Sequence, residues 1–253
     1  MVFLDPVLNP LLQPLLNKSP FLSLLVLALA ISLTITLVYK FFTNQVEMKS
    51  LKEKQKDYQK KMKELRSNPE EMMKMQKEAM QVNMEYMKHS FKPTLITMLP
   101  ILLIFGWMSA HLMYEPIYPG EPYSITVTFA DAITGPAELV VDEGTTLTSD
   151  AVQDIKDGTV TWNLKSDTGT HLLTVKQGDV QQEKKVLITK ELKYEDSETS
   201  YDHSEIEKIT INYNKLKPLG QYSLFGWYPG WLGVYIMFSI VFSIGLRKIL
   251  KIH

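Results

Sequence analysis

Three long apolar stretches alternate with polar segments along the chain. The stretches cover residues 21–42, 93–115 and 221–246. Each is long enough to cross a bilayer as a helix, which takes about 20 predominantly apolar residues. Pro93 and Pro100 predict a break and a kink where the second stretch begins, because proline cannot donate a backbone hydrogen bond. The pattern predicts an α-helical membrane protein with three transmembrane helices.

Residues 43–92 carry apolar side chains at alternating spacings of three and four, in two runs of similar length. Between the runs, Asn68 predicts a helix N-cap, Pro69 the first helical position and Glu71 the capping-box partner. Spacing of this kind is that of a heptad seam, so we predict an antiparallel coiled-coil hairpin. The predicted seam consists of Met48, Leu51, Gln55, Tyr58, Met62 and Leu65 in the first arm and Met72, Met75, Ala79, Val82, Tyr86 and His89 in the second.

Residues 116–220 follow a different period, in which apolar and polar residues alternate. The alternation is clearest at Tyr123–Phe129 and Val160–Leu164, and glycine-containing turns separate such runs. Short strands at this spacing are typical of a small immunoglobulin-like β-sandwich, in which Trp162 is expected to be the core tryptophan. The acidic stretch Glu191–Glu207 is expected to be a mobile loop.

Residues 1–20 have proline at every fourth position, at Pro6, Pro10 and Pro14. This spacing predicts that no regular helix forms there. Leucine pairs between the prolines keep the segment apolar, so we expect it to lie in the outer membrane interface. A disordered apolar tail is the alternative. Because no basic start or small-residue cleavage site accompanies the first span, the span is expected to be a retained anchor.

The charges of the polar segments predict the orientation of the chain. Residues 40–92 hold thirteen Lys/Arg against eight Asp/Glu, whereas residues 116–218 hold ten against eighteen. Cytoplasmic loops are enriched in Lys and Arg, so residues 43–92 and the basic tail 247–253 are expected inside and the β region outside. An aromatic belt at residues 227–231 fits the outer interface. We predict a multi-pass protein of the cell membrane, with its N-terminus outside and its C-terminus cytoplasmic.

The composition excludes several kinds of chemistry. The chain has no cysteine, which rules out disulfides, thiol catalysis and thiolate metal sites. Its five histidines are scattered and show no ligand spacing, and no nucleophile–base pair or phosphate-binding loop stands out. We therefore expect a protein that is not an enzyme and that needs no cofactor or metal.

Hydroxyl side chains recur along the predicted spans. In the first and third spans they precede Lys40 and Arg247 at intervals of four residues. If these stripes converge, they line a polar groove open to the cytoplasm and closed toward the outside, which would lower the cost of moving a polar segment partway across lipid. Alternatively, each hydroxyl bonds its own helix backbone or joins neighbouring helices. The predicted groove residues are Ser32, Thr34, Thr36, Thr94, Thr97, Ser239 and Ser243.

Methionine is concentrated in the predicted hairpin, where eight of the thirteen Met residues lie in residues 48–87. On the second arm one Met stripe falls on the seam, and another is rotated away from it by about 100°. Exposed Met suits the binding of varied apolar segments, and interspersed lysines favour acidic lipid or RNA phosphate. Packing against the membrane surface or a partner helix is the alternative. The predicted client or ribosome contacts are Met73, Met80, Met84, Met87, Lys74, Lys77 and Lys88.

Three segments, Asn68–Gln76, Lys92–Pro100 and Trp231–Lys248, resemble those of a known family. Together with the first span and the basic hairpin that follows it, they are similar to archaeal YidC-like proteins of the YidC/Oxa/Alb membrane protein insertase superfamily. The resemblance implies a membrane protein insertase or chaperone that acts without nucleotide hydrolysis, through a polar groove open to the cytoplasm and to lipid. It implies nascent membrane proteins as clients and contact of the hairpin with the ribosome.

The chain also departs from its relatives. Many of them carry an arginine inside the first core span, where this chain has none, and bacterial relatives have five core spans rather than three. The groove is therefore expected to be simpler than in those relatives, or to be completed by a partner membrane subunit. Two other functions stay open: a membrane scaffold or sensor that links the outer β domain to a cytoplasmic partner, and a small cation channel. The apolar outer halves of the spans disfavour the channel.

Overall fold

The computed structural model describes residues 3–65, 68–131, 133–223 and 225–252. Residues 66–67 of the predicted hairpin, residue 253 of the predicted tail and residues 1–2, 132 and 224 lie outside this description. The chain divides into two compact units. The first unit comprises residues 1–7, 21–107 and 232–253, and the second comprises residues 8–20 and 108–231.

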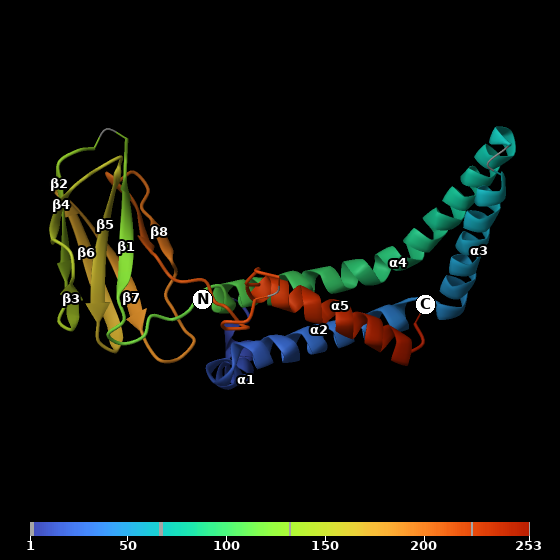
Figure 1. Ribbon diagram of the computed structural model, residues 1–253, viewed down its shortest axis with the longest axis horizontal. Coiled ribbons are helices and arrows are strands. Elements are labelled where there is room, and N and C mark those ends of the chain that lie inside the picture. Colours follow the sequence, from blue (N-terminus) through green and yellow to red (C-terminus); the bar gives the residue numbers. More distant parts are fainter. Residues whose placement is uncertain (1–2, 66–67, 132, 224, 253) are drawn as a thin grey trace. The chain divides into compact units, whose positions relative to one another are not determined.

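The first unit is helical (Figure 1). Its main helices are α2 (Pro20–Phe42), α3 (Gln45–Glu64), α4 (Pro69–Leu112) and α5 (Trp231–Ile249). Three of these, α2, α4 and α5, are long and apolar enough to cross a membrane. The three apolar stretches predicted from the sequence are therefore confirmed as helices of spanning length.

The third spanning helix, α5, begins later than predicted. Residues 221–230 were expected to belong to the span, but α5 starts only at Trp231 and continues to Ile249. Pro229 disfavours helical backbone at the residue before it, and Gly230 is a poor helix former, so the helix begins just after this pair.

The predicted break in the second span is wrong. Helix α4 is 44 residues long and contains both Pro93 and Pro100 (Figure 1, where it curves but is continuous). Proline has no backbone N–H, so Pro93 and Pro100 leave the carbonyls of His89 and Ile96 without their helical donors. The Thr97 hydroxyl bonds two other carbonyls, those of Pro93 and Thr94, each over 3.1 Å. The remaining backbone bonds of the helix are kept, so it continues past both prolines.

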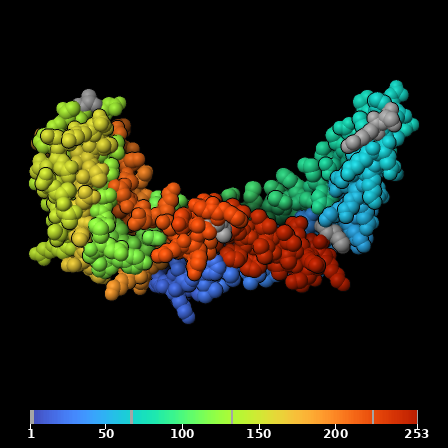
Figure 2. Space-filling model, in the orientation of Figure 1, coloured from blue at the N-terminus to red at the C-terminus, as the bar shows by residue number. Residues whose placement is uncertain are grey.

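Helix α3 and the first half of α4 form an antiparallel pair, whose arms lie side by side (Figure 2). Helix α4 begins at Pro69, as the sequence predicts, with the N–H of Glu71 3.5 Å from Asn68 Oδ1. The seam positions are buried or half-buried in both arms, and Met48 and Leu51 are buried most deeply. Knobs-into-holes packing of a coiled coil stays a prediction. Three pairs of side chains across the arms show that the arms run antiparallel: Glu47 with His89, Gln55 with Asn83, and Tyr58 with Glu78.

The second unit contains a β-sandwich (Figure 1). Its five-stranded sheet has the order β3-β5-β1-β9-β8 and its four-stranded sheet the order β4-β2-β6-β7, with antiparallel pairing between neighbouring strands. The strands are β1 (Tyr123–Phe129), β2 (Pro136–Val141), β3 (Thr145–Leu147), β4 (Val152–Asp154), β5 (Thr159–Ser166), β6 (Gly169–Gln177), β7 (Val180–Ile188), β8 (Glu198–Ser200) and β9 (Ile206–Ile211).

Alternating residues of both sheets form one core, as the period-two pattern predicts. Trp162 is fully buried in this core, and its indole N–H donates to the carbonyl of Ala151 over 3.0 Å. The β-sandwich and its core tryptophan are thus predicted correctly, and the structure gives a β domain inserted between the second and third spanning helices.

The acidic stretch 191–207 is not the simple loop that was expected. It contains β8 and the start of β9. The buried Lys184 of β7 holds it, because its ammonium donates to the carbonyl of Asp196 (2.5 Å) and to the hydroxyl of Thr199 (2.6 Å). Burial lowers the pKa of Lys184, against the raising effect of nearby carboxylates on the same stretch. Lys184 thereby holds part of a segment whose composition resembles that of a loop, and Tyr201 of the same segment donates a further bond to the carbonyl of Glu183.

The N-terminal segment is also more regular than predicted. Helix α1 (Asp5–Lys18) forms despite Pro10 and Pro14 in its interior. Proline every fourth residue places the lost hydrogen bonds in one line along the helix, so the bonds on the other faces remain.

Candidate functional site

A shallow groove lies between α2 and α5, with a volume of about 330 Å³. Its polar lining is Ser32 from α2 with Ser239 and Ser243 from α5. Its apolar lining consists of Ile35, Tyr235, Ile240 and Ile244. The groove therefore brings together serines that are about 200 residues apart in the sequence and were predicted to converge.

The other four predicted groove residues lie outside this lining, and their hydroxyls bond the backbone of their own helices. Thr34 donates to the carbonyl of Ala30, Thr36 to that of Ser32 and Thr94 to that of Ser90, over 2.9, 2.6 and 2.8 Å. Thr97 is likewise bonded within α4. For these threonines the geometry matches the alternative in which hydroxyls satisfy the helix backbone.

The serines of the groove differ from these threonines. Ser239 donates to the carbonyl of Ile236 over 2.9 Å, and its oxygen can still accept a bond. For the hydroxyls of Ser32 and Ser243, the described part of the chain offers no hydrogen-bond partner. The groove is thus lined by three hydroxyls with unused hydrogen-bonding capacity; Ser239 and Ser243 are half-buried, and Ser32 is buried, with 3% of its surface exposed.

Aromatic contacts hold α5 against its neighbours in the first unit. Phe21 of α2 meets Phe238 with ring centroids 5.5 Å apart, and Phe105 of α4 meets Tyr235 at 5.0 Å, both edge to face. At the basic end of the two helices, the Arg247 guanidinium lies 5.3 Å from the centre of the Tyr39 ring. These contacts fix the rotation of α5 that turns Ser239 and Ser243 toward α2.

The predicted Met stripe of the hairpin is exposed. Met73, Met80, Met84 and Met87 show between 51% and 65% of their surface. Lys74, Lys77 and Lys88 are exposed on the same arm. At about 100° per residue the Met stripe continues along one face of α4 into the spanning part, where further exposed apolar residues follow. These are Phe91, Leu95, Met98 and Leu102.

Three titratable residues lie close together across the two arms, near the start of α3. His89 Nε2 lies 3.2 Å from Glu47 Oε1, and Glu85 contributes a third group whose ligand atom is within 4.8 Å of the other two. Sequence inspection missed this group because its members come from different arms, although Glu85 and His89 show the spacing of four that places them on one helix face. With a protonated ring, His89 joins the arms as an ion pair; the expected absence of a metal stays a prediction.

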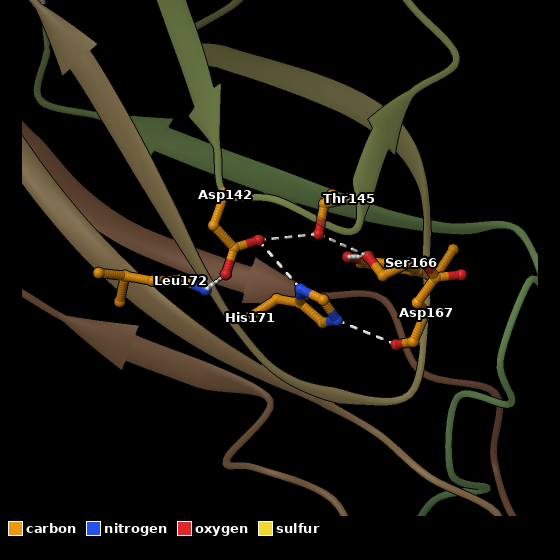
Figure 3. A network of polar contacts seen from close by, with 7 residues as sticks. Asp142, Thr145, Ser166, Asp167, His171 and Leu172 are labelled. Atoms are coloured by element: carbon orange, nitrogen blue, oxygen red, sulfur yellow. Dashed lines mark hydrogen bonds and ion pairs between the residues drawn. The ribbon is translucent and has the colours of Figure 1, made fainter.

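A polar network lies at one end of the β-sandwich (Figure 3). The buried His171 ring bridges Asp142 Oδ1 at 3.0 Å and the carbonyl oxygen of Asp167 at 2.9 Å. Burial raises the pKa of the Asp142 carboxyl, but hydrogen bonds from the Leu172 N–H, from His171 and from Thr145 outweigh it, so the net pKa is lowered. The network closes the β2–β3 connection and is structural.

These features define an integral membrane protein with three candidate spanning helices and an inserted β domain. Residues 5–128 match the family model described as integral membrane protein EMC3/TMCO1-like. The match covers just under half of the chain, from α1 into β1, and leaves out α5 and most of the β domain. No curated protein and no solved structure is found to match the chain.

The EMC3/TMCO1-like family belongs to the Oxa1/YidC/Alb3/EMC3 insertase superfamily. Residues 5–128 therefore resemble members of the insertase superfamily that was expected from the sequence. The narrower relationship to archaeal YidC-like proteins stays a prediction.

Proposed function

We propose that this chain is a membrane protein insertase that helps nascent membrane segments enter the bilayer through the groove between α2 and α5. The observation that carries the proposal is the meeting of Ser32, Ser239 and Ser243 on one open groove. The similarity of residues 5–128 to an insertase superfamily supports it. The protein would act without covalent catalysis, nucleotide hydrolysis or a cofactor.

The chemistry of the groove suits this task. A polar group that enters hydrocarbon without a hydrogen-bond partner costs several kcal/mol. Serine hydroxyls donate and accept, so they can pair with the backbone or polar side chains of a passing segment. The neighbouring isoleucines keep the rest of the surface compatible with apolar side chains. The groove would lower the barrier for a polar flank while the apolar part of the client moves into lipid.

The proposed orientation rests on connectivity and charge. Residues 8–18 of α1 and the β domain both belong to the second unit, and Gln13 and Asn17 of α1 bond the backbone of Leu192. They therefore lie on one side of the membrane, so the chain between them crosses an even number of times, and α2 and α4 are the two helices of that stretch that are long and apolar enough to cross. The basic hairpin is then on the opposite side, which the charge bias assigns to the cytoplasm. The serines lie one or two turns from Lys40 and Arg247, so the groove would open toward the cytoplasm.

The exposed apolar stripe of α4 would guide clients toward the membrane. Flexible methionine side chains adapt to varied apolar sequences. The stripe continues from the hairpin into the spanning part of the same unbroken helix. The seven lysines of α3, against four acidic residues, provide the charge for the proposed contact with the ribosome.

The spanning helices leave much apolar surface uncovered. In the most apolar windows of α4 and α5, 17% and 11% of residues are buried, and α5 is open along its visible face (Figure 2). Lipid and a partner membrane subunit are both expected to cover this surface. A subunit that packs beside α5 would complete the groove.

Site-specific photo-crosslinking to ribosome-bound nascent membrane proteins tests the proposal. Photoreactive residues at positions 32, 239 and 243 are expected to crosslink to clients. Leu29 and Leu103 are exposed apolar controls on α2 and α4 and should crosslink to lipid. Equal crosslinking to clients from groove and control positions, or none from either, would overturn the insertase proposal and favour the scaffold or sensor.

A matched pair of variants tests the groove by activity. Ser32→Leu fills the groove and is expected to reduce insertion of clients with polar flanks in proteoliposomes. Thr34→Leu adds the same side chain two residues away, on an exposed face of the same helix, and should leave insertion unchanged. Equal activity of both variants would contradict a role for the groove.

A further inference from the structure

Helix α1 has one face that is exposed and wholly apolar over its first three turns. Val7 and Leu11 expose 60% and 71% of their surface, and Pro6, Pro10 and Pro14 are exposed beside them. At about 100° per residue these five side chains fall on one side of the helix. No charged residue lies among them.

Other side chains of α1 are buried or hydrogen-bonded to the β domain. Leu12 and Leu16 are buried. The Gln13 amide donates to the carbonyl of Leu192 over 3.0 Å, and the N–H of Leu192 donates to Asn17 Oδ1 over 3.0 Å. A further bond of 2.9 Å from Gln13 to Asn17 braces the pair. Helix α1 thus forms hydrogen bonds with both the N–H and the carbonyl of Leu192 in the β domain.

The connection to α2 determines where α1 lies. Only Ser19 separates the end of α1 at Lys18 from the start of the spanning helix α2 at Pro20. The last turn of α1 must therefore lie at the membrane surface, and Leu11 is only about 10 Å further along the helix axis. An apolar face this close to lipid is expected to enter it, because burial of apolar surface is favourable.

Pro10 and Pro14 determine how deeply α1 can lie in the membrane. Pro10 and Pro14 have no N–H, so the carbonyls of Pro6 and Pro10 lack their helical donors, on the same exposed face. In the hydrocarbon core or under a tightly packed protein these carbonyls would be left unpaired. At the boundary between headgroups and acyl chains, water still reaches them.

From these observations we propose that α1 is a lipid-binding strap: its proline–leucine face lies in the membrane interface, while Gln13 and Asn17 fasten the β domain to that surface. The occupant of the apolar face is the lipid bilayer. The proposal does not depend on insertase activity, since it rests on α1 and its contacts alone.

Single-cysteine labelling tests the lipid contact, because the chain has no native cysteine. Nitroxides are placed at Val7→Cys, Leu11→Cys and the control Val152→Cys of the full chain in phosphatidylcholine–phosphatidylglycerol vesicles. Val152 is a matched control, an exposed valine of the β domain with 54% of its surface accessible. Labels at 7 and 11 are expected to be more accessible to oxygen than to a water-soluble nickel complex, and the label at 152 the reverse.

Two results would overturn the lipid contact. Labels at 7 and 11 could be as accessible to the nickel complex as the label at 152, which would place the face in water. They could also be shielded from both reagents, which would place a second copy or another protein there.

The fastening is tested separately by hydrogen exchange. Asn17→Ala removes the acceptor for the Leu192 N–H and is expected to speed amide exchange around Leu192 about tenfold. Asn17→Asp retains an acceptor oxygen and should preserve protection. Unchanged exchange in Asn17→Ala would show that α1 does not hold the β domain.

Discussion

The phenol oxygen of Tyr194 accepts the backbone N–H of Met113 over 3.0 Å, directly after the last residue of α4. The Tyr194 ring also meets Tyr114 and Tyr213, with centroids 5.6 Å away in both cases. Two backbone bonds, from Glu115 to Asn214 and from Leu216 to Met113, pair the chain entering the β domain with the chain leaving it. Tyr114, Tyr194 and Tyr213 thus form an aromatic neck between the two segments of the chain that enter and leave the β domain.

Replacing Tyr194 with phenylalanine should weaken the neck. Tyr194→Phe keeps the ring contacts but removes the acceptor for Met113, at a cost of about 1 kcal/mol of unfolding free energy. Thermal unfolding of the full chain in nanodiscs measures the loss. Tyr222→Phe, at a tyrosine with 80% of its surface exposed, is the control and should not change stability. An equal effect of both variants would mean that the hydroxyl bond does not matter.

The raised pKa of Tyr194 predicts that the protein loses stability at alkaline pH. Burial raises the pKa of Tyr194 to about 12, from 10.0 in the unfolded chain. Below pH 10 both states are protonated and the full stability is present. As pH rises from 10 through 12 the unfolded state ionises first, so stability falls. The slope of stability against pH in this window should be smaller for Tyr194→Phe than for the unaltered chain.

Acid should weaken the β domain through Asp142. Its pKa is below the unfolded value of 3.8, so its contribution is present above pH 3.8 and is lost as pH falls through the lower folded value. Asp142→Asn keeps one acceptor oxygen but loses the charge that pairs with His171. We expect it to cost about 1 kcal/mol at pH 6. The difference from the unaltered chain should vanish below the folded pKa; a constant difference at all pH values would contradict the role of the charge.

The β core depends on Trp162. Its side chain is fully buried and its indole N–H is bonded to Ala151. Trp162→Ala should destabilise the β domain by about 3–5 kcal/mol, because it leaves a large cavity. Trp162→Phe retains most of the volume and should cost less. The stability of the β domain in these variants is compared by its resistance to limited proteolysis. Trp227→Phe, at an exposed tryptophan, is the control.

Local patterns predicted much of this structure. Hydrophobic length gave the spanning helices, alternation gave strands such as β1 and β5, and the Asn68-Pro69 pair gave the start of α4. Each of these signals acts within one element, so the residues that carry it are neighbours in the sequence.

Features that depend on several elements were harder to predict. Helix α1 was missed because its prolines disfavour a helix, while its bonds to Leu192 come from a distant part of the chain. Among the hydroxyls, the sequence could not separate Ser32, which faces the groove, from Thr36, which bonds the backbone of its own helix. That difference depends on how α2 and α5 are rotated relative to each other, and the rotation involves aromatic partners of α5, Phe21 and Phe105, that lie far from the serines in the sequence.

The exposed methionines of α4 should contribute to client binding without contributing to the fold. Met80→Ser and Met84→Ser together remove two exposed apolar side chains and are expected to lower crosslinking of nascent chains to the hairpin several-fold. The unfolding temperature should stay the same, because both side chains already lie on the surface. Met48→Ser is the contrasting variant: Met48 is a fully buried residue at a predicted seam position of α3, so its loss should destabilise the hairpin. If the Met80→Ser/Met84→Ser variant instead loses stability while crosslinking persists, the stripe packs on another helix, and the client-binding role of α4 is wrong.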